Sequence, residues 1–224
     1  AEAERLLTRA IELMPDEPFP HDYLADVHRM QGRLAEAVEG YTRAMEIDSS
    51  RAGSFLGQRA HAYSFMGDYA AARRDYQAAA DASVGNDEGG GPNWWTRQAG
   101  YTYLYEGDID AAVAEIDRAL AIADTSTSSR AEGDRIATLF DLYLLNGHAG
   151  RVDAAEEART RLNALVRARA ADAEDHVALE MDEEAFRGFY DRTARALWSY
   201  LARVADPREA AERIAGEIRA YFAV

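Results

Sequence analysis

Small and apolar residues recur at the three- and four-residue spacing of a helix along most of the chain. A turn glycine followed by such a segment occurs four times, at intervals of 35, 40 and 43 residues: Gly32, Gly67, Gly107 and Gly150. An amphipathic segment precedes each glycine, at residues 20–30, 54–66, 93–105 and 134–146. The pattern predicts a row of antiparallel helical hairpins. Residues 1–15 carry the second half of the pattern alone.

The second helix of each predicted hairpin repeats one order of side-chain sizes. An alanine stands five residues after the glycine, at Ala37, Ala72, Ala112 and Ala155. Seven residues later come Ala44, Ala79 and Ala119, with Leu162 in the fourth hairpin. Between the two lies a larger residue: Tyr41, Tyr76 or Ile116. Small residues at this spacing let two helices cross closely, and the larger residue is expected to fill the space between hairpins.

This register resembles the tetratricopeptide repeat family over residues 1–165. The first helices carry matching residues where that family has Leu, Gly and Tyr: Leu24, Ala25 and His28, then Ala60 and Tyr63, then Ala99, Gly100 and Tyr103. The resemblance implies an all-α, right-handed superhelical solenoid of antiparallel hairpins, followed here by a C-terminal helical pair. It also implies a concave surface formed by the first helices, where this family binds extended peptides or partner helices.

Composition agrees with an all-helical fold and excludes several kinds of chemistry. The chain of 224 residues has 46 alanines, 5 prolines and no cysteine, so disulfides and thiolate sites are excluded. Its 25 basic residues are all arginine and are outnumbered by 40 acidic residues, which gives a net charge of −15. That balance argues against a nucleic-acid-binding surface, which needs Lys and Arg to displace counterions. We predict a solenoid domain at 1–171 and C-terminal helices at 172–224.

Neither a targeting signal nor a membrane span is predicted. The first helix lacks the charged-then-apolar pattern of a signal peptide. The most apolar stretch, residues 136–145, contains Asp141, and a span needs about 20 apolar residues. We therefore expect a cytoplasmic protein. The chain begins inside a periodic helix, which suggests a fragment of something longer.

The candidate partner-binding face consists of first-helix residues that lie off the packing stripe. In the third hairpin these are Trp94, Arg97, Tyr101 and Tyr105, aromatic and arginine side chains of the kind that anchor interfaces. The first two hairpins add Asp22, Asp26, Arg29 and His61. The same aromatic residues could instead pack between neighbouring helices, and this alternative stays open. The Lys and Asn with which some family members clamp a terminal carboxylate are missing, so that class of ligand is disfavoured. Acidic residues beside aromatic ones favour a basic or mixed helical segment as the partner.

No arrangement of residues predicts catalysis or metal binding. The five histidines are scattered, and no nucleophile, zinc-protease or dinucleotide motif occurs. Adjacent carboxylates such as Glu156 and Glu157 diverge on a helix. We therefore expect no enzyme, no metal and no cofactor.

The C-terminal segment admits two interpretations. It can be an atypical last hairpin that caps the solenoid. Alternatively, it resembles the polymerase-core-binding region of extracytoplasmic-function sigma factors, on Phe186, Tyr190, Leu197, Tyr200, Asp206, Ala211, Glu212 and Glu217. Arg213 and Gly216 depart from that pattern, and the promoter-binding elements are missing. That resemblance implies contact with bacterial RNA polymerase without DNA recognition.

Two functional hypotheses follow from the sequence. The first is a protein-interaction scaffold that binds a peptide or helix in the concave groove, with self-association possible because the exposed ends of repeat stacks can pair. The second is a transcription-related regulator in which the repeats are fused to a sigma-like fragment.

Overall fold

The computed structural model describes residues 2–84 and 91–173, and every regular element in these two ranges is helical. The first part contains α1 (Glu2–Leu13), α2 (Pro18–Met30), α3 (Leu34–Ile47), the short 3₁₀ helix η1 (Ser49–Arg51), α4 (Ala52–Met66) and α5 (Tyr69–Ala82). The second part contains α6 (Gly91–Glu106), α7 (Ile109–Thr125), α8 (Ala131–His148) and α9 (Val152–Ala173). The predicted first helices correspond to α2, α4, α6 and α8, with starts two or three residues earlier than expected.

The hairpin turns have one recurring geometry. Gly67 ends α4 in the left-handed region, with φ of 80°, and the backbone N–H of Asp68 donates to the Tyr63 carbonyl. Glycine is favoured at this position because it has no β-carbon and adopts the left-handed conformation without a steric clash. The Asp68 carboxylate then caps α5 by accepting from the N–H of Ala71. The three other predicted turn glycines also have a positive φ, of 77°, 83° and 73°: Gly32, Gly107 and Gly150.

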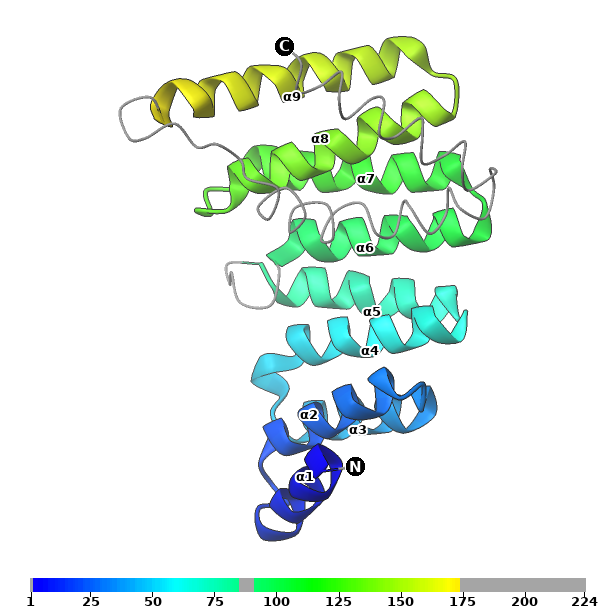
Figure 1. Cartoon of the computed structure of the whole chain (residues 1–224), viewed down its shortest axis with the longest axis vertical. Coiled ribbons are helices and arrows are strands. Elements are labelled where there is room, and N and C mark those ends of the chain that lie inside the picture. The colour runs from blue at the N-terminus through cyan, green and yellow to red at the C-terminus, as the bar shows by residue number, and fades with distance from the viewer. Residues whose placement is uncertain (1, 85–90, 174–224) are drawn as a thin grey trace. The chain divides into compact units, whose positions relative to one another are not determined.

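The core lies where the size pattern placed it. In the first three hairpins, the two alanines that follow the turn glycine at the repeated spacing are fully buried: Ala37 and Ala44, Ala72 and Ala79, Ala112 and Ala119. The larger residues between them, Tyr41, Tyr76 and Ile116, are also buried. The second helices α3, α5 and α7 each pack against their own first helix, and α3 and α5 also pack against the next first helix. In Figure 1, α2 to α7 accordingly follow one another as stacked hairpins.

The chain divides into two compact units, residues 1–138 and 139–224, and the division falls inside α8. The first unit holds α1 to α7 and the start of α8. In the described part of the second unit, Leu142 and Leu145 of α8 and Leu162 of α9 are buried. The predicted domain boundary at residue 171 lies at the end of the described ranges and stays a prediction. The predicted C-terminal helical pair lies outside them.

Candidate partner-binding face

Two predicted residues and one core tyrosine form a hydrogen-bonded network between α2 and α3. The Tyr41 hydroxyl donates to Asp26 Oδ1 over 2.7 Å, and Arg29 Nη2 donates to the same oxygen over 2.9 Å. Arg29 Nε also donates to the Tyr41 hydroxyl over 3.0 Å. Burial and the bond to Asp26 raise the pKa of Tyr41 well above its usual value. The Asp26 carboxylate is therefore held in place by two donors.

Asp22 lies one turn before Asp26 on α2, and one of its carboxylate oxygens lacks a hydrogen-bond partner. Its Oδ1 atom is buried and has no hydrogen-bond partner. Burial, and then the negative charge of Asp26, raise the pKa of Asp22 from 3.8 to about 6, with Arg29 opposing the shift. A hydrogen-bond donor or a positive charge at this position would stabilise the ionised form of the Asp22 carboxylate.

His61 of α4 belongs to an aromatic cluster with Tyr76 and Trp95. Its Nδ1 atom lies 2.6 Å from the Tyr76 hydroxyl, and its ring centroid lies 5.3 Å from that of Tyr76 and 5.9 Å from that of Trp95. Burial, followed by the charge of Arg29, lowers the pKa of His61 to about 4. The imidazole is consequently neutral at neutral pH.

The four predicted anchors on α6 do not form an open face. Arg97 is 2% exposed and Tyr101 is 4% exposed, and Arg97 Nη2 donates to the Tyr101 hydroxyl over 2.8 Å. Trp94 is half-buried against the cluster that contains Trp95, while Tyr105 is half-buried and stacks on Tyr69 at 5.7 Å. The expected solvent-facing stripe is therefore wrong for Arg97 and Tyr101, because a helical period cannot tell an open face from a covered one. Their role as anchors stays a prediction.

Exposed apolar side chains lie on α2 beside the carboxylates instead. The rings of Phe19 and Tyr23 stack at 6.2 Å, both are exposed, and Met30 is exposed at the end of the helix. The guanidinium of Arg51 lies over the Phe19 ring at 5.1 Å. Phe65 of α4 is exposed at the repeat position of Met30, two residues before the turn glycine. Tyr23, Met30 and Phe65 were not predicted as part of this face, although Met30 and Phe65 share one spacing from the turn glycine that could have indicated them.

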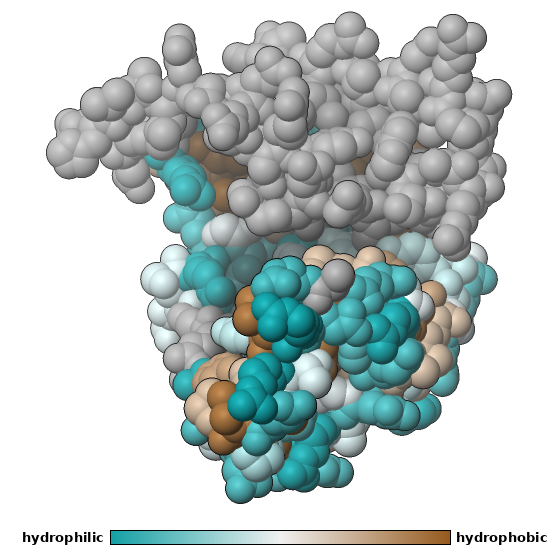
Figure 2. Space-filling view, turned by 60° about the horizontal axis from the view of Figure 1, so that its bottom comes forward, coloured by the Kyte–Doolittle hydropathy of each residue, from teal (hydrophilic) through white to brown (hydrophobic). Residues whose placement is uncertain are grey.

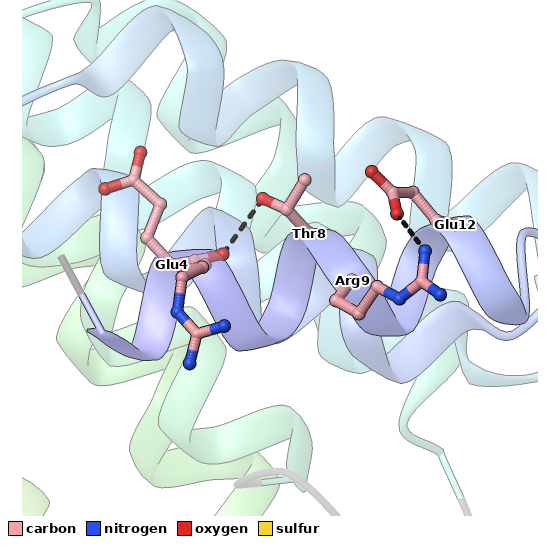
Figure 3. Close-up of a pocket in the computed structure, with 5 residues that line it drawn as sticks. Glu4, Thr8, Arg9 and Glu12 are labelled. Atoms are coloured by element: carbon pink, nitrogen blue, oxygen red, sulfur yellow. Dashed lines mark hydrogen bonds and ion pairs between the residues drawn. The ribbon is translucent and has the colours of Figure 1, made fainter.

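The described residues contain no metal-binding cluster. Within residues 2–84 and 91–173 no group of three or more His, Asp or Glu side chains could hold a metal ion. A shallow hollow lies on the polar side of α1, between Glu4, Arg5, Thr8, Arg9 and Glu12. Figure 3 shows Arg9 bonded to Glu12 there, and Thr8 bonded to the Glu4 carbonyl. Arg5 pairs with Glu2, and Glu4 pairs with Arg33, so each charged side chain of the hollow already has a partner.

A search of the same ranges finds no helix long and apolar enough to span a membrane. The cytoplasmic location expected from the sequence stays a prediction, as does the lack of enzymatic activity.

Comparison with known proteins agrees with the hairpin geometry. The tetratricopeptide repeat family model matches residues 54–83 and 98–125. No curated protein matches the chain in sequence. Among solved structures, BtubC (BKLC) from P. vanneervenii is similar with 17% identity and a TM-score of 0.60, covering 100% of this chain and 90% of its own.

Two further structures have the same kind of fold. TPR-like repeats of a kinesin-light-chain-type protein from Podosopora anserina align at 18% identity and a TM-score of 0.57, covering 79% of this chain and 89% of theirs. A tetratricopeptide repeat protein from Parabacteroides merdae ATCC 43184 aligns at 21% identity and a TM-score of 0.50, covering 96% and 72%. At these identities the likeness concerns the fold alone.

The fold thus belongs to the class of all-α solenoids built from helical hairpins, as predicted. Within that class, residues 54–83 and 98–125 match the tetratricopeptide repeat family, and the neighbouring hairpins repeat the same turn-glycine and alanine positions.

Proposed function

We propose that this protein is an interaction scaffold that binds a peptide or helix of a partner protein on the face formed by α2, α4 and α6. The family supports the general role, because tetratricopeptide arrays present preformed surfaces to other proteins. On this face the proposed contacts are Asp22, Asp26, Arg29 and His61, extended onto α6 by Trp94, Arg97, Tyr101 and Tyr105. On α6 the first contacts would come from the half-buried Trp94 and Tyr105, because Arg97 and Tyr101 are buried.

The observation that carries the proposal is the position of Asp22 beside exposed aromatic rings. Its buried Oδ1 has no partner, whereas the neighbouring Asp26 is already bonded by Arg29 and Tyr41. An arginine or lysine of the partner would provide the missing hydrogen bond and stabilise the ionised carboxylate. Phe19 and Tyr23 would accept the apolar side of the same segment. The partner segment is therefore expected to be amphipathic and basic.

A peptide pair of equal length tests this partner chemistry. One peptide is an amphipathic helix with arginines on its polar face, and the other has glutamates there. We expect fluorescence anisotropy to show tighter binding of the arginine peptide, and Asp22→Asn and Tyr23→Ala to weaken it about tenfold, a loss of about 1.4 kcal/mol. Glu39→Gln removes an exposed charge from α3 and serves as the control. Equal affinity for both peptides, or equal effects of Asp22→Asn and Glu39→Gln, would contradict the proposal.

The α6 part of the face is tested separately with Trp94→Ala and Tyr105→Ala, because these two side chains are only partly buried. If α6 contributes, both variants weaken binding of the arginine peptide while keeping the helical circular dichroism spectrum. Unchanged affinity in both variants would limit the site to α2 and α4.

The alternative function, contact with RNA polymerase, rests on the sigma-like residues of the 172–224 segment, which the structure does not describe beyond residue 173. Its support is the sequence resemblance alone. Binding of the full chain to core RNA polymerase, lost on Tyr190→Ala and Leu197→Ala, is the expected result. The absence of any binding would remove this alternative.

A further inference from the structure

Two exposed apolar side chains lie at the turn ends of α2 and α4. Met30 and Phe65 both stand two residues before a turn glycine, and they are 74% and 65% exposed. The α2–α3 and α4–α5 turns lie along the same side of the first unit (Figure 1). Figure 2 brings the α1 end of this unit forward, and brown apolar areas are visible there among hydrophilic ones. We call Met30 and Phe65 the turn-end pair.

The helices that carry the turn-end pair are neighbours. Ala25 of α2 and Ala62 of α4 belong to one buried cluster with Ala37 and Tyr41 of α3, so both first helices lie against the same second helix. Because α4 packs against both α3 and α5, the exposure of Phe65 does not result from an end of the array. Repeated hairpins place equivalent residues at the same height on neighbouring helices. The turn-end pair therefore forms an apolar strip that crosses from α2 to α4.

A polar strip lies beside the turn-end pair, nearer to the start of the same two helices. Asp26 and His61 each lie one turn before the pair, and Asp22 lies one turn further back on α2. His61 is neutral at neutral pH because burial lowers its pKa to about 4. Arg29 is bonded to Asp26, whereas the buried Asp22 Oδ1 has no hydrogen-bond partner. Asp22 is therefore the group of this strip that a cationic side chain would stabilise.

The distance between the two strips matches the width of a helix. Asp22 and Met30 are eight residues apart on α2, which corresponds to about 12 Å of helix rise. An α-helix with its side chains is about 10–12 Å across. One helix lying across α2 and α4 can therefore contact both strips, with cationic side chains on one flank and apolar side chains on the other.

We propose that the partner segment is a basic amphipathic α-helix that lies across α2 and α4. An arginine or lysine of this helix binds Asp22, and its apolar side chains pack on Met30 and Phe65. The rings of Phe19 and Tyr23 lie beside Asp22 and contact apolar atoms of the helix next to the cation. The net charge of −15 favours the approach of such a segment. This inference rests on the function proposed above, which by itself requires neither a helical conformation nor a contact with Phe65.

Two adjacent residues of α4 separate this inference from the general function. Met30→Ala and Phe65→Ala in the full chain should each weaken binding of the arginine peptide about tenfold in fluorescence anisotropy. Met66 is 50% exposed but lies about 100° around the helix from Phe65, so Met66→Ala should leave the affinity unchanged. Circular dichroism checks that the three variants keep their helices.

The outcomes of this comparison are distinct. If Met30→Ala and Phe65→Ala bind as tightly as Met66→Ala while Asp22→Asn still weakens binding, this inference is overturned and the proposed function stands. An arginine peptide that does not bind the natural sequence at all would overturn both.

The helical conformation is tested with a second form of the arginine peptide that has one central proline in place of a solvent-facing residue. Proline interrupts a helix, so this peptide should bind at least about tenfold more weakly. Equal affinity of the two forms would mean that the segment binds in an extended conformation, and would overturn the inference.

The direction of the helix is tested by cross-linking, because the chain contains no cysteine. Met30→Cys and Phe65→Cys should form disulfides under mild oxidation with cysteines placed at opposite ends of the apolar face of the arginine peptide. Met66→Cys should form neither disulfide. Cross-linking of the same peptide end to both Met30→Cys and Phe65→Cys would show that the helix does not lie across α2 and α4.

Discussion

The indole ring of Trp95 lies directly against the α-carbon of Gly57, so that a β-carbon at residue 57 would lie 2.2 Å from Trp95 Cη2. Gly57 is on α4 and Trp95 is on α6, the first helices of consecutive hairpins. Trp95 also contacts the rings of His61 and Tyr76. The missing side chain at residue 57 thus allows one tryptophan to link the α4–α5 hairpin with α6.

Gly57→Ala is expected to destabilise the protein. The Trp95 ring must shift, and it is buried within a packed cluster, so the overpacking should lower the free energy of unfolding by about 1–3 kcal/mol. Urea unfolding followed by circular dichroism measures the change. Gly133→Ala on α8 is the matched control, because nothing lies within 4 Å of a β-carbon there. That control should be neutral or stabilising by up to about 1 kcal/mol. Equal effects of the two substitutions would show that the Trp95 contact is not tight.

Asp75 and Arg59 form a two-pronged ion pair inside the α4–α5 hairpin. Arg59 Nε donates to Asp75 Oδ2 over 2.6 Å, and Nη2 donates to Oδ1 over 3.0 Å. Because Asp75 is nearly buried, Asp75→Ala should leave the arginine without its counter-charge and cost about 3–5 kcal/mol in unfolding free energy. Glu46→Gln breaks the exposed pair with Arg43 and should cost less than about 1 kcal/mol. Similar losses in the two variants would contradict this ranking.

The periodic residues predicted the fold because each has a local physical cause. Gly67 is needed where φ is positive, and Ala72 is needed where α5 crosses its neighbour. Such requirements repeat with every hairpin and are therefore visible in a single sequence. The Arg59–Asp75 pair was not predicted, because two residues 16 positions apart on different helices leave no periodic signal.

The candidate site was predicted less completely than the fold. Spacing placed Asp22, Asp26 and Arg29 together on one side of α2, and the structure brings them together with Tyr41. Spacing also placed Arg97 and Tyr101 on an open face, yet both are buried. Helical periodicity fixes the side of a helix on which a residue lies. It contains no information on which other parts of the chain cover that side.

His61 should stay neutral through the physiological pH range. Burial and the charge of Arg29 lower its pKa to about 4. Its imidazole NMR signals should therefore not titrate between about pH 5.5 and about pH 8, the range in which an unperturbed histidine changes charge. Since the folded-state pKa is depressed, His61 contributes stability above pH 6.5 that is lost as the pH falls toward 4. Assignment by comparison with His61→Gln identifies the signal. An inflection near pH 6.5 would show that the ring is solvated rather than enclosed by Tyr76 and Trp95.

Asp22 should make stability depend on pH in the opposite direction. Its pKa is raised from 3.8 to about 6 in the folded protein, so between these values the folded state binds more protons than the unfolded state. Asp22 therefore weakens the fold as the pH rises through this window, and the full penalty is present above pH 6. Asp22→Asn cannot ionise. Its unfolding free energy, relative to that of the natural sequence, should increase from pH 4 to pH 6.5 and then level off.

Urea unfolding at half-unit pH steps measures that difference, which isolates Asp22 from the other titrating groups. Glu39→Gln, which replaces an exposed carboxylate of α3, is the matched control. If an arginine of the peptide binds the Asp22 carboxylate, adding the peptide should also flatten the pH dependence of the unfolding free energy, because a positive charge beside the carboxylate lowers its pKa. Parallel curves for Asp22→Asn and the natural sequence would mean that Asp22 is already satisfied, and the reason to expect a basic partner at this position would be lost.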